Sequence, residues 1–395
     1  MTSDEITPSR PFGSERQFQI YLAGLQGQRP KMPIAAEALE REGNAHMTPE
    51  ARGYVAGGAG EDTMRANREA FRRWRIVPRM LRDVSRRDLS VQVLNTRLPV
   101  PLLLAPIGVQ SIVHPDAEVA VAHAAASVGV PFILSTASSK SMEQVAQAAG
   151  DVPRWYQLYW SSDDQLNASL VRRAERAGYQ AIVVTLDTTL LSWREQDLQQ
   201  AYLPFLLGQG LANYFSDPVF RQSLPQPPEA NPEAAIQRFI AVFSDPAMTW
   251  PDMNSLRQHT RLPILLKGIL HPDDARKAIE YGMDGIIVSN HGGRQVAGAI
   301  AALDALPAVV QAVNGALPVL FDSGIRGGSD VLKAIALGAR AVLLGRPYMW
   351  GLALDGEAGV REVLQNFLAD LDLTLALSGY SSFENVDTAA LYKSE

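Results

Sequence analysis

From residue 100 onward, short apolar runs alternate with segments of helical periodicity, and this rhythm constrains the fold more than any other feature. The eight runs begin at Leu102, Pro131, Arg154, Ala181, Pro263, Gly285, Pro318 and Ala341. Each has the length and composition of a strand buried on both faces. Several helical segments between them open on Asp or Ser and close on Gly, as capped helices do. The alternation predicts an α/β fold, a (β/α)8 TIM barrel.

Two further features fix the expected domain organisation. Residues 1–99 predict an N-terminal arm and a lead-in to the barrel, whereas residues 100–395 predict the barrel itself. Within the arm, residues 1 to about 48 are weakly periodic and predict one or two short helices. An α/β barrel fills this length as one domain. A doubly wound open sheet is the alternative fold, but no GxGxxG pattern follows any run.

The fourth and fifth runs are separated by an insertion of about fifty residues. It spans residues 196–250, is rich in Pro, Gln and aromatic residues, and has no long apolar run. Loops that follow barrel strands cover the active sites of such folds. We therefore expect the insertion to be an active-site lid.

Composition excludes several classes of function. The net charge of −6 offers no basic excess for nucleic acid or an anionic membrane. The chain has no cysteine, which excludes disulfides, thiolate catalysis and cysteine-ligated metals, and the six histidines form no HxxxH or HxH pair. The polar N-terminus has no apolar segment behind it, and no window is apolar enough to span a bilayer. We expect a cytoplasmic protein with no metal.

Polar or small residues follow every run, at the strand ends where barrels place their functional groups. The run at residues 285–288 is followed directly by Ser-Asn-His-Gly-Gly-Arg, in which His291 and Arg294 lie three residues apart. A titratable base beside a permanent cation suits removal of a proton or hydride from the carbon next to a carboxylate. The alternative is a surface loop with a solvated Arg.

The last two strand ends predict a phosphate site. Gly324 and Arg326 precede a helix, and Gly345 and Arg346 follow the eighth run. Glycine amides, a helix N-terminus and forked guanidinium donors together bind phosphate oxygens, and these barrels bind phosphate at this place. The alternative is a Gly-rich turn before a capped helix.

The sequence leaves the roles of three further charged residues open. Lys267 ends the fifth run, where it could form a Schiff base or stand as a fixed cation beside an electron sink. Asp187 could orient His291 or cap a helix, and Arg194 could clamp a carboxylate or form a surface ion pair. Tyr54 precedes a run of small residues, which by itself favours a flexible loop; the alternative is a backbone that approaches a ligand closely with the Tyr hydroxyl aimed inward.

Taken together, these motifs resemble the FMN-dependent enzymes that oxidise L-2-hydroxy acids. The resemblance rests on SNHGGRQ, LKGI, TLDT, WRE, QLY, DSGIRGGSDVLKAIALGA and GRP, from about Tyr54 to Val386. Within that family, YVAGGAG, APIGV, LPFL and NYFSDPVF are most similar to lactate 2-monooxygenase. The resemblance implies FMN as cofactor, small 2-hydroxy acids and O2 as partners, and a homotetramer or octamer.

The resemblance also implies a role for each site residue. His291 is then the catalytic base paired with Asp187, and Arg294 and Arg194 hold the substrate carboxylate with the hydroxyls of Tyr54 and Tyr159. Lys267 stabilises the reduced flavin. The remaining cofactor-binding residues are Pro106, Ile107, Gly108, Ser135, Gln157, Thr185, Ser289, Asp322, Gly324, Arg326, Gly345 and Arg346.

Three departures from the common family pattern bear on specificity. Ala137 stands where many members carry a bulky aromatic over the substrate side chain, so a longer hydroxy acid could fit. Ile107-Gly108 replaces Thr-Ala, and Leu190 replaces a frequent Arg, and both bear on oxygen reactivity. We expect a lactate 2-monooxygenase that yields acetate, CO2 and water. The alternatives are an oxidase that yields 2-oxo acid and H2O2, a quinone-linked dehydrogenase, and a ligand-binding barrel without catalysis.

Overall fold

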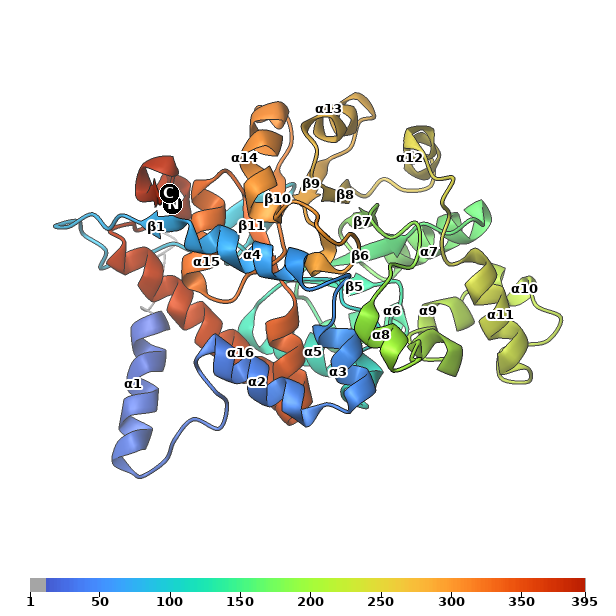
Figure 1. Cartoon of the computed structure of the whole chain (residues 1–395), viewed down its shortest axis with the longest axis horizontal. Coiled ribbons are helices and arrows are strands. Elements are labelled where there is room, and N and C mark those ends of the chain that lie inside the picture. Colours follow the sequence, from blue (N-terminus) through green and yellow to red (C-terminus); the bar gives the residue numbers. More distant parts are fainter. Residues whose placement is uncertain (1–11, 395) are drawn as a thin grey trace, which may run out of the picture.

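The eight predicted strands close into a parallel barrel in the computed structural model, which describes residues 12–394 (Figure 1). The strands are β4 (Leu102–Leu104), β5 (Phe132–Ser135), β6 (Arg154–Tyr159), β7 (Ile182–Thr185), β8 (Ile264–Ile269), β9 (Gly285–Val288), β10 (Val319–Phe321) and β11 (Ala341–Leu344). The barrel closes between its first and last strands, where Leu103 of β4 is in register with Leu343 of β11. The predicted (β/α)8 fold is confirmed.

Apolar runs form these strands because both faces of the sheet are covered. Every residue of β5, β7, β9 and β11 is buried, with helices outside and packed side chains inside. The covering helices are α5 (Ala117–Val128), α6 (Met142–Ala149), α7 (Asp164–Arg176), α12 (Trp250–Arg257), α13 (Pro272–Glu280), α14 (Ala302–Val313), α15 (Gly328–Ala336) and α16 (Arg346–Leu377). Some of the predicted caps are present: Asp163 accepts from the amide of Leu166, and Gly129 ends α5 with a φ of 71°. Others are not, because Asp116 makes no side-chain cap bond and α13 and α15 are preceded by His271 and Gly327.

From residue 12 onward, four helices precede the barrel: α1 (Phe12–Leu25), α2 (Ala36–His46), α3 (Pro49–Ala56) and α4 (Asp62–Arg72). In Figure 1, α1 stands at the lower left beside α16, α4 crosses in front of the barrel, and α3 lies below it next to α2 and α8. Short strands complete this region: β1 (Trp74–Ile76) pairs with β12 (Leu391–Lys393), and β2 (Val91–Val93) with β3 (Thr96–Leu98). The amides of Asn67 and Asn290 bond reciprocally at 2.9 and 2.8 Å, which fixes α4 against the loop after β9.

The insertion after β7 contains α8 (Glu195–Gln199), a 3-10 turn (Pro204–Leu207), α9 (Ala212–Phe215), α10 (Pro218–Gln222) and α11 (Pro232–Val242). Its aromatic residues form a buried cluster, in which the ring of Phe239 lies 4.8 Å from Tyr214 and 5.2 Å from Phe205. This cluster packs α9 and α11 of the insertion against its 3-10 turn and is continuous with the core of the barrel. The role of the insertion as a lid stays a prediction.

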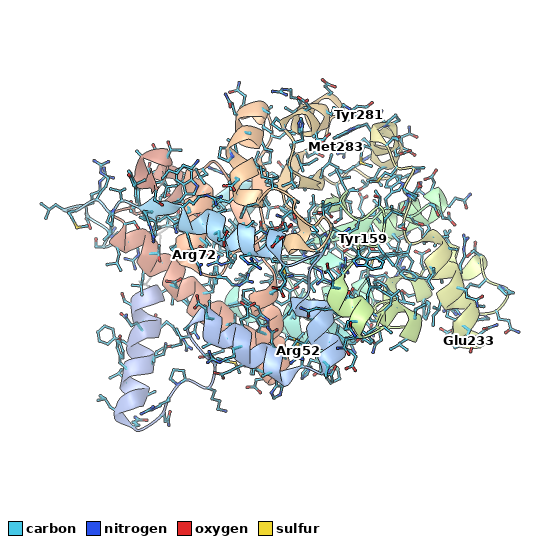
Figure 2. The ribbon with its side chains drawn as sticks, in the orientation of Figure 1. Arg52, Arg72, Tyr159, Glu233, Tyr281 and Met283 are labelled. Atoms are coloured by element: carbon cyan, nitrogen blue, oxygen red, sulfur yellow. The ribbon has the colours of Figure 1, made fainter. Side chains whose placement is uncertain are left out.

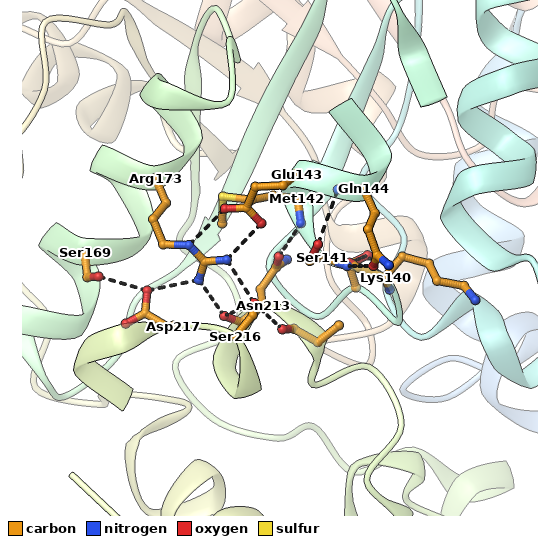
Figure 3. A network of polar contacts seen from close by, with 12 residues as sticks. Lys140, Ser141, Met142, Glu143, Gln144, Ser169, Arg173, Asn213, Ser216 and Asp217 are labelled. Carbon is orange, nitrogen blue, oxygen red and sulfur yellow. Dashed lines mark hydrogen bonds and ion pairs between the residues drawn. The ribbon is translucent and has the colours of Figure 1, made fainter. Parts of the chain in front are cut away.

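A polar network binds α9 and α10 of the insertion to the barrel (Figure 3). The guanidinium of Arg173, on α7, donates to Asp217 at 3.1 Å, to Glu143 at 3.0 Å and to the carbonyl of Asn213 at 2.8 Å. The side chain of Asn213 accepts from the amide of Met142 and donates to the carbonyl of Thr136, directly after β5. The network therefore fixes α9 and α10 against the strand end that borders the site.

The described residues can also be searched for a membrane-spanning helix and for a metal site, neither of which the sequence predicted. Between residues 12 and 394, no helix has the length and apolarity that a membrane span requires. The same part of the chain contains no group of three His, Asp or Glu side chains placed to hold a metal ion.

Candidate functional site

A cavity of about 910 Å³ opens at the carboxyl ends of the barrel strands. Most of the predicted site residues line it, and the lining is Tyr54, Val55, Ala105, Pro106, Ile107, Gly108, Tyr159, Arg194, Lys267, His291, Gly292, Arg294, Asp322, Ser323, Gly324, Ile325, Arg326, Leu343, Gly345 and Arg346. Figure 2 shows Tyr159 toward the middle of the molecule, whereas Glu233 of α11 lies at its outer edge.

The predicted base and its partner meet in this cavity. His291 Nδ1 lies 2.8 Å from Asp187 Oδ1, which leaves the Nε2 atom of His291 for the cavity. Burial lowers the pKa of His291 and outweighs the opposing effect of Asp187. Burial acts to raise the pKa of Asp187, but the charge of His291 and the hydrogen bond lower it overall. The pair is thus a neutral imidazole oriented by an ionised carboxylate.

Arg294 is held at the cavity wall by the N-terminal helices. Its Nη1 atom donates to the carbonyls of Tyr54, at 2.5 Å, and Gly57, at 2.8 Å, and its guanidinium stacks 5.2 Å from the centre of the Tyr54 ring. Burial, reinforced by the charge of Arg194, lowers the pKa of Arg294 to about 10. The guanidinium of Arg294 is buried and keeps N–H donors beyond those on Nη1, so it is suited to bind an anionic ligand.

Arg194 lies beside it, at the N-terminus of α8. Its Nη2 atom donates to Gln295 Oε1 at 2.7 Å, and its Nε atom to the carbonyl of Arg294 at 3.2 Å. Gln295 in turn donates to the carbonyl of Asp187 at 2.5 Å, so it links the arginine to the partner of His291. Tyr54 and Tyr159 complete this wall, and burial raises the pKa of both phenols, which keeps their hydroxyls protonated as donors.

Lys267 forms the floor of the cavity and is only 4% exposed. Its Nζ atom donates to Ser289 Oγ at 3.0 Å and lies 3.3 Å from Asp322 Oδ2. An ammonium has three donors, so one remains for a ligand above the floor. Of the two roles left open by the sequence, a fixed cation paired with Asp322 matches this geometry.

A row of hydrogen-bonded side chains continues beneath the cavity. Ser135 Oγ donates to Gln157 Oε1 at 3.1 Å, and Gln157 Nε2 donates to Thr185 Oγ1 at 2.9 Å. All three are at most 3% exposed and do not belong to the cavity lining. The structure therefore brings these predicted cofactor ligands to the floor, one layer below the open space.

Arg326 and Arg346 make one end of the cavity cationic. Arg346 donates to the carbonyls of Val55, Gly57 and Gly292 at 3.0 to 3.1 Å, and its burial lowers its pKa to about 9. Arg326 stacks 4.9 Å from the ring centre of Trp350. A phosphate at this end would offset the cost of burying both guanidinium groups.

The Gly-rich turn before α15 differs in one respect from the predicted phosphate loop. The amide of Arg326 donates to Asp330 at 2.9 Å and that of Gly328 to Asp370 at 2.5 Å. These two amides are therefore occupied by carboxylates within the chain. The cationic character of this end comes from the arginine side chains.

Ala137 does not reach the cavity, although the sequence suggested that it makes room for the substrate. It is 2% exposed, and a Cβ added at Gly108 would lie 2.8 Å from its carbonyl oxygen. Ala137 thus packs behind the Pro106–Gly108 turn, which itself lines the cavity. The open space over the substrate side chain has to be explained by other residues.

Three residues of the site were not assigned a role from the sequence. Ser323 lines the cavity with a φ of 84°, and its Oγ atom accepts from the amide of Gly292 at 3.0 Å. Gln295 and Asp197 both contact Arg194. Ser323 and Gln295 lie within recognised motifs, whereas Asp197 has no sequence signal beyond its place three residues after Arg194.

The described residues fit FMN, the cofactor that the sequence motifs imply. The cavity is open above Lys267, whose remaining donor faces a ligand that gains negative charge. Its cationic end, at Arg326 and Arg346, matches a phosphate. Pro106, Ile107 and Gly108 also line the cavity, where the sequence motifs imply that they lie behind the flavin.

Comparisons with known proteins agree with this assignment. A family model described as FMN-dependent dehydrogenase matches residues 43–393. The L-lactate oxidase of Lysinibacillus sphaericus is 44% identical over 377 residues, which cover 95% of this chain and 97% of that protein. The 2-hydroxyacid oxidase 1 of Homo sapiens is 41% identical, covering 86% of this chain and 91% of its own. A crystal structure of mandelate oxidase aligns with a TM-score of 0.81 at 38% identity, over 91% of this chain and 98% of that one.

Proposed function

The chain belongs to the FMN-dependent dehydrogenase family and oxidises 2-hydroxy acids with FMN as its cofactor, and on that premise we propose L-lactate as its substrate and O2 as its electron acceptor. The observation that carries the proposal is the His291–Asp187 pair beside two cavity-facing arginines. Three of the relatives are named L-lactate oxidases, from Lysinibacillus sphaericus, a Nostoc strain and Alicycliphilus denitrificans.

The residues divide the work of the reaction. Arg294 and Arg194 bind the substrate carboxylate, and the phenols of Tyr54 and Tyr159 donate to its oxygens. The Nε2 atom of His291 takes the proton released on oxidation, and Asp187 stabilises the imidazolium that results. FMN, when bound, would supply the acceptor for the two electrons of the alcohol. Lys267, Arg326 and Arg346 are the residues proposed to hold it.

A substrate panel tests the proposal. The purified protein, reconstituted with FMN, should consume O2 with L-lactate and not with D-lactate, because the two arginines and His291 fix one face of the α-carbon. Glycolate and L-mandelate measure how much side chain the cavity accepts. A protein that bleaches with L-mandelate and not with L-lactate under nitrogen would contradict the proposed substrate, and one that bleaches with neither would favour a ligand-binding barrel.

For the product, we propose the monooxygenase outcome, in which pyruvate stays in the site and reacts with the H2O2 formed there to give acetate, CO2 and water. The observation that favours it is a contact between the insertion and the N-terminal loop, in which Glu195 of α8 accepts from the amide of Gly60 at 2.8 Å. This contact supports the predicted role of the insertion as a cover of the site. Such a cover would slow the escape of pyruvate.

Product analysis under air distinguishes the two outcomes. The monooxygenase yields acetate and CO2 in the presence of added catalase, because the H2O2 never leaves the site. Pyruvate as the main product with catalase present would instead identify an oxidase. Reduction by lactate without reoxidation by O2, but with reoxidation by a quinone, would identify the dehydrogenase.

A further inference from the structure

Asp197 is a nearly buried carboxylate placed directly behind the substrate-binding arginines. Its side chain is 13% exposed, and its Oδ2 atom lies 3.8 Å from Nη1 of Arg194. Its Oδ1 atom is buried and has no hydrogen-bond partner among the described residues. The charge of Asp197 also acts on Arg294 and on the phenol of Tyr54. No step of the proposed reaction uses this group.

The charges around the carboxylate site explain what it does. Two other carboxylates lie near the cavity: Asp322 pairs with the ammonium of Lys267, and Asp187 is hydrogen-bonded to the imidazole of His291, so neither forms an ion pair with Arg194 or Arg294 among the described residues. Arg194 and Arg294 together carry two positive charges, whereas a 2-hydroxy acid and its 2-oxo acid product each carry one negative charge. When Asp197 is ionised, the two arginines and Asp197 together carry a net charge of +1, which a bound monoanion neutralises.

We propose that Asp197 sets the affinity of the site for monoanions, by offsetting part of the charge of Arg194 and Arg294, and so limits how tightly the 2-oxo acid product is held. This inference rests on the proposed function. Asp197 acts through the arginines and is a positioning residue. It does not line the cavity, so its effect reaches the ligand as charge and as the orientation of the Arg194 fork.

The Asp197→Asn variant tests this without relying on turnover. Pyruvate is titrated into FMN-loaded protein under nitrogen, and binding is followed by the change in flavin absorbance. We expect the Kd for pyruvate to fall about fivefold to tenfold, the size of a charge effect acting over a few ångströms in a partly buried site. The uncharged analogue pyruvamide should bind the variant and the wild type equally.

Two control variants and a kinetic measurement separate the effect of charge from an effect on structure. Asp197→Glu keeps the charge and should restore the wild-type Kd. Asp151→Asn makes the same chemical change at an exposed carboxylate after α6 and should have no effect. In steady state, Asp197→Asn should lower KM and also kcat, because the product leaves more slowly.

The possible outcomes distinguish a failure of this inference from a failure of the proposed function. An unchanged Kd for pyruvate in Asp197→Asn, or a loss of affinity for pyruvate and pyruvamide alike, would overturn the inference while leaving the proposed function in place. A wild-type protein that neither oxidises L-lactate nor binds pyruvate would overturn the proposed function, and the inference with it.

Discussion

At the scale of single residues, the pKa of His291 determines how activity depends on pH. The base must be neutral to accept a proton, and burial lowers the pKa of His291 from its usual value of 6.5. The neutral form therefore persists below pH 6.5, and kcat/KM for L-lactate should fall only when acidification passes the lowered pKa. Asp187 acts to raise that pKa, so Asp187→Asn should move the acid limb to still lower pH. A limb that moves upward in this variant would contradict the assignment.

Removal of the imidazole tests the same assignment by rate. His291→Ala should slow anaerobic flavin reduction by L-lactate by about 10³-fold or more, the scale of losing an essential general base. FMN should remain bound, because Lys267, Arg326 and Arg346 are untouched. Rapid-mixing absorbance measures both quantities in one experiment. Near-normal reduction in His291→Ala would show that another group takes the proton.

At the scale of elements, the insertion depends on the buried ion pair between Arg173 and Asp217. Their side chains are 6% and 0% exposed. Arg173→Met would leave the Asp217 charge buried without its partner, so the free energy of unfolding should drop by about 3–5 kcal/mol. Urea unfolding measures the change. The matched control is Arg172→Met, since Arg172 is the exposed neighbour on the same helix and should cost little. Equal losses in both variants would contradict the role of the network.

The strands could be predicted because their burial leaves a direct trace in the sequence, a continuous apolar run such as Ile286–Val288. The spacing of the strands also predicted the insertion, but its internal packing could not be predicted, because the partners of Tyr214 and Phe239 come from separate short helices and share no period. The site shows the same division. His291 and Lys267 end recognisable runs, whereas the burial of Ala137 behind Gly108 follows from tertiary packing.

At the scale of the whole molecule, the sequence motifs imply a homotetramer or octamer. Helix α1 exposes four large apolar side chains at helical spacing, Phe18, Tyr21, Leu22 and Leu25, which are 58% to 84% exposed. We expect light scattering to give the mass of a tetramer or octamer, and Leu22→Glu to shift the protein toward smaller species. A wild-type protein of monomer mass at micromolar concentration would contradict this prediction.

The closure of the barrel between β4 and β11 has a consequence for the order of events in folding. Ala105 and Ile107 follow one of these strands and Gly345 and Arg346 the other, and all four line the same cavity. The complete cofactor site therefore exists only after strands from distant parts of the chain have paired. A ligand that binds only this closed state stabilises it by mass action. During refolding, flavin capture should be the last event, and the yellow colour of a preparation then reports the fraction of molecules whose barrel has closed.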